Sequence, residues 1–530
     1  MTPEAATATA TTAAETAAAA TAEAEATATA TAAPATREPA SAPVATTQRA
    51  HVAIIGAGHS GLCMAIRLKQ AGLDDFVILE KAATLGGTWR DNTYPGASCD
   101  APSFLYSFSF AQKTDWSRRF AWAAELLGYS TELAIRHGLL RHCRFAAEVT
   151  QAVYDDAANT WTLTCADGSR VVADFVVTGT GQLNRPSIPD LPGRDAFDGA
   201  QFHSAAWNHA IDLGGKRIAV IGNAASAVQF VPQIAPLAAQ LTVFQRSANW
   251  LLPRKDRLYA PRTQRLLTRH PQLARLYHAC QWFYFGEMQL TPLMKQVRLV
   301  QWLARRRALA HLRRQVADPA LRARLVPDYP IGAKRVLFND DYYPALGRPN
   351  VRLVTDGIER LEPRGVRTRD GELHEADVVV WATGFKSTDF LAPMQVVGRG
   401  GRRLADEWSR GAHAYLGVTV SGFPNFFMLY GPNTNLGHNS ILVMIEAQVG
   451  YVLDALAKMR ARGLTRLDVR RTVMDDYNRA LQRDLARSVW STIGASWYKL
   501  ADGTITNNWP HSTIRYRRLL REAHLEDYES

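Results

Sequence analysis

Three glycines near the start of the sequence have the spacing of a phosphate-binding turn. Gly56, Gly58 and Gly61 form a G-x-G-x-x-G motif directly after the apolar run His51–Ile55. The first glycine of such a motif allows a tight turn, the second lets the backbone approach a pyrophosphate, and the third lets a helix pack closely on a strand. The free N–H groups and positive dipole end of that helix attract phosphates. The motif therefore predicts a dinucleotide site.

An acidic residue follows at the distance that such a site requires. The run Phe76–Leu79 has the apolar composition of a short buried strand, and Glu80 comes directly after it. A carboxylate about 20 residues beyond the glycines accepts hydrogen bonds from ribose hydroxyls. Because strand, glycines, helix and acid all agree, a glycine-rich turn without a ligand is the weaker interpretation.

A second, degraded copy of the turn follows the apolar run Arg217–Ile221. It reads Gly222-Asn-Ala224-Ala-Ser226-Ala227. Ala227 is an accepted substitute at the third position, but Ala224 replaces the glycine that lets a phosphate come close. The second site is therefore expected to hold its ligand more loosely or slightly displaced.

The residue that follows the next strand distinguishes between two nicotinamide cofactors. Arg246, in Gln245-Arg246-Ser247, stands where an NAD site carries an acid. A guanidinium suits a 2′-phosphate through charge-assisted hydrogen bonds. The pattern predicts NADPH, although a plain surface arginine is the alternative interpretation.

These motifs need elements that position them. Two strand–turn–helix–strand units at wide separation predict an α/β fold with two Rossmann-like dinucleotide-binding domains rather than a short repeat. From about 261 to 326 the hydrophobic pattern becomes helical, with arginine-rich faces. A helical insertion is therefore expected inside the second domain.

Composition limits the classes of partner. The chain has 530 residues, 47% of them hydrophobic, and a formal net charge of +12. Such a charge suits nucleic acid, a membrane surface or anionic small molecules. No basic run is interleaved with aromatics in the manner of a nucleic-acid site, so we expect no nucleic-acid partner. Phosphate-bearing cofactors would use part of the positive charge.

The cysteines and the N-terminal segment bear on location. The five cysteines include no C-x-x-C pair, which argues against a disulfide framework, a zinc site and the redox pair of a flavin disulfide reductase. A reducing compartment, the cytoplasm, is expected. Residues 1–46 are rich in Ala and Thr and lack the aliphatic stretch of a signal peptide, so they predict a disordered tail. No uninterrupted apolar run is long enough to cross a membrane, so we expect no transmembrane segment.

At this point the pattern resembles the class B flavoprotein monooxygenases, most closely the type I Baeyer–Villiger monooxygenases. The most discriminating segment is Phe197-x-Gly199-x-x-x-His203-x-x-x-Trp207, which matches the fingerprint F-x-G-x-x-x-H-x-x-x-W. Asn208 departs from the Pro or Asp that usually follows. Further segments of this resemblance are Gly86-Gly87-Thr88-Trp89, Tyr94-Pro95-Gly96, Cys99-Asp100, Thr178–Gly181, Lys334-Arg335 before Asp341–Pro344, and Ala382–Phe385.

The resemblance implies an enzyme that uses FAD, NADPH and O2 on a ketone or other apolar small molecule, through a C4a-peroxyflavin. It implies that Arg335 is catalytic, stabilising anionic oxygen, and that Asp100 pairs with it and tunes its position. Lys334, Arg246 and Ser247 would hold the 2′-phosphate. The predicted cofactor-binding residues are Gly56, Gly58, Gly61, Glu80, Gly87, Thr88, Trp89 and Asp100 on the flavin side, and Gly222, Ser226, Arg246, Ser247, Lys334 and Trp497 on the NADPH side.

The motifs predict a discontinuous FAD domain and a discontinuous NADPH domain. The expected division is the tail 1–46, FAD domain 47–181, NADPH domain 182–250, helical insertion 251–329, NADPH domain 330–383 and FAD domain 384–530. His203 and Trp207 then fall near the connection between the domains, where they could couple domain movement to turnover.

Two other functions stay open at this point. A flavin monooxygenase that oxidises amine nitrogen or sulfide sulfur would fit Asn208 but not Trp207, because that group usually has Phe or Tyr there. A non-catalytic nucleotide-binding or membrane-surface protein finds its best support in the basic stretch Lys295–Arg324, although such runs are usually solvated helix faces. The sequence leaves peripheral membrane contact, the oligomeric state and the identity of the substrate open.

Overall fold

The computed structural model describes residues 47–437, 439–494 and 496–530. The predicted disordered tail, residues 1–46, lies outside the described residues. Residues 47–530 belong to one compact unit.

The first glycine-rich turn belongs to a large mixed sheet. Strands β3, β2, β1, β6 and β18 are parallel neighbours in this order, and the hairpin β4–β5 extends the sheet beyond β6. The strands are β1 (Thr47–Ile55), β2 (Phe76–Leu79), β3 (Cys143–Arg144), β4 (Val149–Asp155), β5 (Thr160–Cys165), β6 (Arg170–Thr178), β17 (Gln395–Val397) and β18 (Phe426–Met428). The last two come from far along the chain, so this sheet is built from two distant segments.

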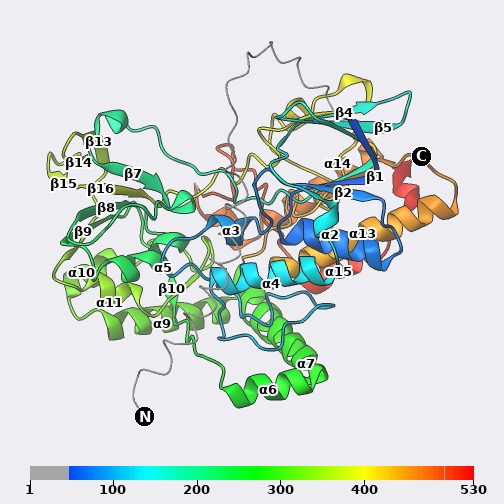
Figure 1. Ribbon diagram of the computed structural model, residues 1–530. Coiled ribbons are helices and arrows are strands. Elements are labelled where there is room, and N and C mark those ends of the chain that lie inside the picture. The colour runs from blue at the N-terminus through cyan, green and yellow to red at the C-terminus, as the bar shows by residue number, and fades with distance from the viewer. Residues whose placement is uncertain (1–46, 438, 495) are drawn as a thin grey trace, which may run out of the picture. The chain divides into compact units, whose positions relative to one another are not determined.

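The second glycine-rich turn belongs to a smaller sheet in which all neighbours are parallel, in the order β12-β9-β8-β16-β7. Its strands are β7 (Ala200–His203), β8 (Arg217–Ile221), β9 (Gln240–Phe244), β12 (Val351–Val354) and β16 (Val378–Trp381). Figure 1 shows the two sheets in separate parts of the unit. The predicted α/β class with two nucleotide-type sheets is confirmed.

Alternation along β8 shows why the smaller sheet needs cover on both faces. Ile218 and Val220 join one buried cluster, whereas Ala219 and Ile221 join another. Period-two alternation sends successive side chains to opposite faces, and here both are apolar, as in a parallel sheet buried on both sides. Helices α5 (Ala225–Ile234) and α11 (Tyr342–Leu346) cover one face. The antiparallel strands β13 (Ile358–Glu362), β14 (Gly365–Thr368) and β15 (Leu373–Glu375) cover the other.

The large sheet is covered mainly by helices α2 and α13 (Figure 1). The helices of this part are α2 (His59–Gln70), α3 (Thr88–Asp91), α4 (Ala123–Arg136), α12 (Leu404–Glu407), α13 (Ile441–Ala461), α14 (Arg471–Leu485) and α15 (Thr513–Leu519). Two short pairings complete the strands: β10 (Leu251–Leu252) with β11 (Leu337–Phe338), and β19 (Asp468–Val469) with β20 (Tyr528–Glu529).

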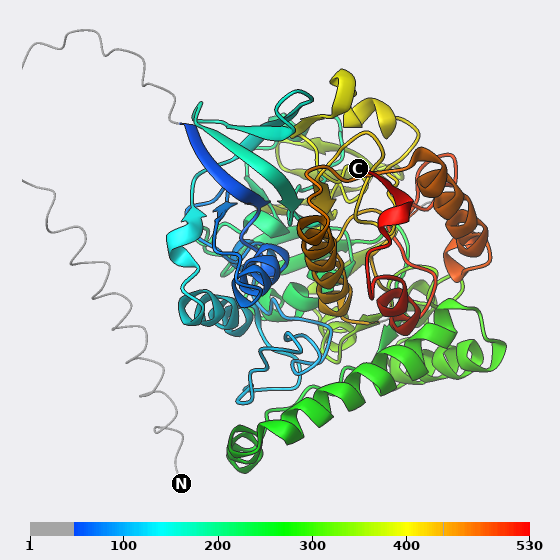
Figure 2. The ribbon, with the colours of Figure 1, turned by 90° about the vertical axis from the view of Figure 1, so that its right-hand side faces the viewer.

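The helical pattern between 261 and 326 does form helices. They are α6 (Pro261–Arg269), α7 (Pro271–Gln281), a π-helix (Trp282–Leu290), α8 (Thr291–Met294), α9 (Arg298–Gln315) and α10 (Pro319–Arg324). In Figure 2 the green helices that begin with α6 and α7 run along one side of the unit. No helix among the described residues combines the length and the apolar character needed to cross a bilayer.

The two connections between the sheets lie against each other. Pro186 and Phe385 form an antiparallel bridge, and the amide of Ser187 donates to the carbonyl of Gly384. Gly384 has φ +84°, in the left-handed region, where glycine is the default residue. The exact limits of the predicted domains stay a prediction, but the chain crosses between the sheets at these two places.

The fingerprint glycine is required by packing. A Cβ on Gly199 would lie 2.3 Å from the carbonyl oxygen of Asp377 and 2.6 Å from the ring of Phe197. Gly199 precedes edge strand β7, which pairs with β16 from Ala200 to His203. Phe197 and Gly199 therefore seat this strand against the end of the segment that leads into β16.

We expect Gly199→Ala to lower the free energy of unfolding by about 1–3 kcal/mol, because the neighbouring backbone must shift. Urea unfolding measures the change. Gly450→Ala in α13 is the matched control, because a Cβ there meets nothing within 4 Å, and it should be neutral or stabilising. Equal stability of the two variants would contradict this packing role.

Candidate functional site

The first glycine-rich turn is shaped by backbone contacts at two of its three glycines. Gly56 has φ +104°, and a Cβ there would lie 2.7 Å from the carbonyl oxygen of Gly179. A Cβ on Gly61 would lie 1.8 Å from the carbonyl oxygen of Gly56. At Gly58 the nearest atom would be Cα of Gly87, at 3.8 Å. Gly58 thus leaves open the surface at the start of α2 that a pyrophosphate would occupy.

Glu80 lies where the sequence predicted it, directly beside this turn. Its carboxylate is 5% exposed and accepts hydrogen bonds from the amides of Ala57 (2.8 Å) and Ala82 (3.0 Å). Arg90 also donates to it, at 3.1 Å. The arginine was not predicted. It holds the carboxylate in place, so ribose hydroxyls would share this acceptor with Arg90.

The predicted segment Gly87-Thr88-Trp89 packs against the same turn. Gly87 has φ +52°, and a Cβ there would lie 3.2 Å from Cα of Gly58. Helix α3 begins at Thr88, and the indole N–H of Trp89 donates to the hydroxyl of Tyr106 at 3.3 Å. The segment therefore forms one wall of the predicted dinucleotide site at the first glycine-rich turn, here called the first cradle.

The second turn repeats the strained start of the first. Gly222 has φ +107°, and a Cβ there would lie 2.4 Å from the carbonyl oxygen of Ala382. Ala224 is the N-cap of α5, and Ser226 lies in the first turn of that helix. The turn therefore keeps its backbone shape. The side chain of Ala224, at the second glycine position, takes up space only on the side where a ligand would bind.

Cations gather at the end of β9. The Nζ of Lys334 donates to the Oγ of Ser247 at 2.8 Å and lies 4.5 Å from the centre of the Tyr329 ring. Burial, and next the positive charge of Arg246, lower the pKa of Lys334. Within the described residues neither Lys334 nor Arg246 forms an ion pair with a carboxylate. The cluster therefore suits a phosphate.

Asp100 and Arg335, 235 residues apart, form a two-pronged ion pair. Nε of Arg335 donates to Oδ2 at 2.9 Å, and Nη2 donates to Oδ1 at 2.7 Å. The side chains are 26% and 34% exposed. The negative charge of Asp100 raises the pKa of Arg335 further above its usual range. Arg335 is thus a permanent cation in a fixed orientation.

A second arginine at this place was missed by the sequence analysis. Nη2 of Arg254 donates to the carbonyl oxygen of Cys99 at 2.9 Å and to the Oγ of Ser98 at 3.0 Å. Its guanidinium lies 4.9 Å from the centre of the Phe120 ring, and burial lowers its pKa. Arg254 therefore fixes the backbone that directly precedes Asp100.

Gln229 of α5 holds the same loop from the other side. Its Oε1 accepts from the hydroxyl of Tyr94 (3.0 Å) and from the amide of Ser98 (3.3 Å), and its Nε2 donates to the carbonyl of Ser98 (2.9 Å). A Cβ on Gly96 would lie 2.8 Å from the Gln229 carbonyl oxygen. The loop that carries Asp100 is therefore attached to α5, the helix that follows the second glycine-rich turn; the predicted dinucleotide site at that turn is here called the second cradle.

The remaining fingerprint residues lie on this connection. Nδ1 of His203 accepts from the amide of Ala205 at 3.1 Å, and burial lowers its pKa, which favours the neutral ring. Trp207 packs between Tyr94, with ring centres 6.5 Å apart, and Phe230, at 5.2 Å. Trp207 therefore links the flavin-side loop to α5.

Trp497 lies beside one of the two connections between the sheets, here called the crossover. Its ring centre is 4.2 Å from that of Tyr498, and its carbonyl accepts from the Oγ of Ser387 at 2.8 Å. Tyr498 is 1% exposed, and its hydroxyl has no hydrogen-bond partner among the described residues. The C-terminal segment thus reaches the place where the chain passes between the sheets.

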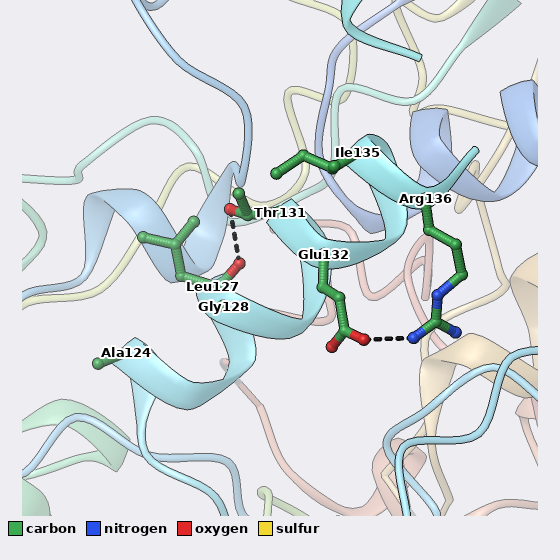
Figure 3. A pocket seen from close by; sticks show the side chains of 7 residues that line it. All are labelled: Ala124, Leu127, Gly128, Thr131, Glu132, Ile135 and Arg136. Carbon is green, nitrogen blue, oxygen red and sulfur yellow. Dashed lines mark hydrogen bonds and ion pairs between the residues drawn. The ribbon is translucent and has the colours of Figure 1, made fainter. Parts of the chain in front are cut away.

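Two pockets lie near these elements. One, of about 360 Å³, is lined by residues that include Lys81, Arg90, Asp91, Asn184 and Phe385. It lies beside the Glu80 end of the first cradle, and its size suits part of a ligand. The other, of about 620 Å³, is apolar and is lined only by residues of α4 (Figure 3). None of the predicted site residues lines this second pocket.

Comparisons with known proteins agree with this geometry. Residues 53–276 match the family model described as pyridine nucleotide-disulphide oxidoreductase. A protein from Pseudomonas aeruginosa named Baeyer-Villiger monooxygenase is 43% identical over 91% of this chain and 92% of its own length.

The chain belongs to the Baeyer–Villiger monooxygenases. Two solved structures are also similar, each with a TM-score of 0.80. An oxidized steroid monooxygenase bound to NADP is 31% identical, over 89% of this chain and 97% of its own. A complex of OTEMO with FAD and NADP is 27% identical, over 90% of this chain and 98% of its own.

Membership of the Baeyer–Villiger monooxygenases confirms the resemblance that the fingerprint indicated. It also confirms that the protein is an enzyme with two dinucleotide-binding units. The individual roles of the predicted site residues stay predictions, although the structure brings Asp100 to Arg335 and Lys334 to Ser247.

Glu80 provides a direct test of the first cradle. We expect Glu80→Gln to lower the free energy of unfolding by about 1–3 kcal/mol, because an amide donor would face other donors in a buried place. The purified variant should also retain less FAD. Urea unfolding and the flavin absorbance measure both changes.

Glu132→Gln is the control, because its carboxylate pairs with Arg136 on the exposed surface of α4. This change should alter stability by no more than about 0.5 kcal/mol. A Glu80→Gln variant with unaltered stability and full flavin content would show that Glu80 does not hold the cradle.

Proposed function

We propose that this Baeyer–Villiger monooxygenase uses FAD, NADPH and O2 to insert one oxygen atom beside the carbonyl of a ketone, which gives an ester or lactone. The observation that carries the proposal is the Asp100–Arg335 pair, whose loop is attached to the helix of the second cradle. A fixed cation between two dinucleotide sites suits a reaction in which negative charge develops on oxygen.

The first cradle fits FAD. Gly58 leaves room at the start of α2 for a pyrophosphate, and Glu80 presents a buried carboxylate to the ribose side. Gly87, Thr88 and Trp89 close the adjoining wall. When bound, the flavin supplies the electrons and the reactive carbon with which O2 is activated.

The second cradle fits NADPH. Gly222 and Ser226 lie at the pyrophosphate position of α5. Lys334, Arg246 and Ser247 form a cluster at the end of β9, and among the described residues no carboxylate forms an ion pair with either cation. A 2′-phosphate would supply the missing negative charge. Trp497, beside the crossover, would cover the nicotinamide half of the cofactor.

Arg335 is the proposed catalytic residue. Asp100 occupies Nε and Nη2, so the remaining nitrogen, Nη1, is free of this pair and can donate to a ligand oxygen. Because Asp100 is itself held by Arg254 and Gln229 through the neighbouring backbone, Nη1 has a fixed direction. Fixed donors stabilise a developing charge without reorganisation during the reaction.

The substrate is proposed as a ketone rather than an amine or a sulfide, because Trp207 completes the fingerprint. Asn208, which departs from the usual pattern, forms an ordinary local turn in which its side chain accepts from the amide of Ala210 at 3.0 Å. The departure is therefore accommodated in a local turn. A cytoplasmic location stays a proposal.

Oxygen insertion is tested with a panel of cyclic and linear ketones, NADPH and ¹⁸O2, scored by product mass. We expect ester or lactone with one labelled oxygen and one NADPH oxidised per product. Arg335→Ala should retain FAD but lose about 10²–10³-fold in kcat, since a charge-stabilising donor is removed. Full ketone turnover by this variant, or sulfoxide as the only product when a thioether is added to the ketone panel, would sink the proposal.

Coenzyme selection is tested at Arg246. Arg246→Ala should raise the KM for NADPH about 10–100-fold and leave that for NADH nearly unchanged, because a charge-assisted contact with the 2′-phosphate contributes about 1.5–3 kcal/mol. Steady-state kinetics with both coenzymes measure the ratio. Arg257→Ala, at an exposed arginine, is the control; a proportional loss with both coenzymes would place Arg246 elsewhere than at the 2′-phosphate.

A further inference from the structure

Exposed apolar side chains concentrate in one segment of the chain. Of the eighteen exposed large apolar residues among the described residues, eleven fall between 258 and 303. Exposed apolar residues scattered singly are ordinary, but a dense group marks an interaction surface. They are Leu258, Leu266, Leu273, Leu276, Phe283, Tyr284, Met288, Val297, Leu299, Trp302 and Leu303.

The same segment carries most of the protein's net charge. Residues 258–317, here called the basic arm, contain eleven Arg and Lys residues against one acid, a formal charge of +10 in a chain whose total is +12. None of these cations forms an ion pair with a carboxylate in the described part of the chain. The cations are Arg262, Arg265, Arg269, Arg275, Lys295, Arg298, Arg305, Arg306, Arg307, Arg313 and Arg314.

The one acid of the basic arm is turned inward. Glu287 is 8% exposed, and its Oε1 accepts from the amide of Thr513 at 2.9 Å and from Nδ2 of Asn439 at 3.3 Å. The indole N–H of Trp282 donates to the hydroxyl of the same Thr513 at 2.8 Å. The π-helix thus anchors the basic arm on the C-terminal segment and leaves no carboxylate on its outer surface.

The helices of the basic arm are weakly buried. Ala274 is the buried residue of α7, whereas Leu273 and Leu276 are 42% and 61% exposed. In α9 the guanidinium of Arg306 lies 5.3 Å from the centre of the Trp302 ring, and Trp302 is itself 53% exposed. Figure 2 shows helices of this arm running along one side of the unit. Apolar anchors and arginines therefore share the outer surface.

We propose that the basic arm docks this protein on an anionic lipid surface. Helices that lie in a bilayer interface combine Trp, Phe and Leu on one face with Arg and Lys around them. The arginines meet lipid phosphates and the apolar side chains enter the headgroup region. A lipid surface would bind both the arginines and the exposed apolar side chains. Solvation alone leaves the apolar side chains in water, and a purely electrostatic contact uses only the arginines.

Other occupants fit less well. A second copy docked through the same surface would bring eleven unpaired cations against eleven more, without a carboxylate to separate them. A nucleic acid would satisfy the arginines but leave Leu273, Leu299 and Met288 without apolar partners. An anionic bilayer offers both negative charge and an apolar layer.

The test uses the full chain, loaded with FAD, and sedimentation with two kinds of vesicle. One is pure phosphatidylcholine, and the other contains phosphatidylglycerol. We expect binding to the anionic vesicles only, and partial release at 1 M salt, because the electrostatic part is screened while the apolar part stays.

Two variants separate the two parts of the proposal. Arg305→Gln/Arg306→Gln/Arg307→Gln should lower vesicle affinity about tenfold or more, since each removed charge near an anionic surface weakens binding. Trp302→Gln/Leu303→Gln should make the remaining binding fully salt-sensitive. All five residues are exposed, so turnover of a water-soluble ketone should be unchanged.

The matched control is Arg479→Gln/Arg483→Gln/Arg487→Gln, which removes the same charge from exposed positions in and just after α14. It should bind vesicles like the unaltered protein. Equal loss in this control, no binding to anionic vesicles, or preferred binding of a 30-mer RNA would each overturn the proposal. So would a dimer that the Trp302→Gln/Leu303→Gln change dissociates in the absence of lipid.

Discussion

The structure depends on one ion pair that joins distant parts of the chain. Arg335 precedes strand β11, and Asp100 lies on a loop of the flavin-side sheet; their two hydrogen bonds of 2.7 and 2.9 Å fix a permanent cation on the loop that Gln229 attaches to α5. A lone half-buried guanidinium would lose part of its hydration, and the carboxylate offsets that cost while leaving part of the donor set free.

Several contacts that no sequence motif predicted hold the loop that carries Asp100. Arg254 holds the backbone at Ser98 and Cys99, and Gln229 holds Tyr94 and Ser98 from helix α5. Trp207 packs on the same loop through Tyr94. Helix α5 and Trp207, both on the side of the second sheet, are therefore attached to the loop that carries Asp100.

The distribution of charge divides the molecule into two functional surfaces. The Lys334–Arg246 cluster lies at the end of a buried strand and suits a single phosphate, whereas the basic arm spreads unpaired arginines among exposed apolar side chains. Net charge alone does not distinguish these uses. What distinguishes them is whether neighbouring side chains enclose the cation or leave it beside Leu, Phe and Trp on the outside.

The sequence by itself determined the features that depend on local backbone geometry. Gly56 and Gly222 have positive φ, and Gly61 approaches the carbonyl of Gly56 within the same turn, so their spacing alone predicted both cradles, and Gly199 and Trp207 identified the family. The resemblance to the family supplied the pairing of Asp100 with Arg335, and the domain limits stay a prediction. Only the tertiary structure revealed Arg90 on Glu80, Arg254 and Gln229 on the Asp100 loop, and the inward turn of Glu287. Most of these contacts join residues more than a hundred positions apart, and even Arg90 meets Glu80 only once α3 has packed. A side chain's partner is set by packing, which no spacing along the chain records.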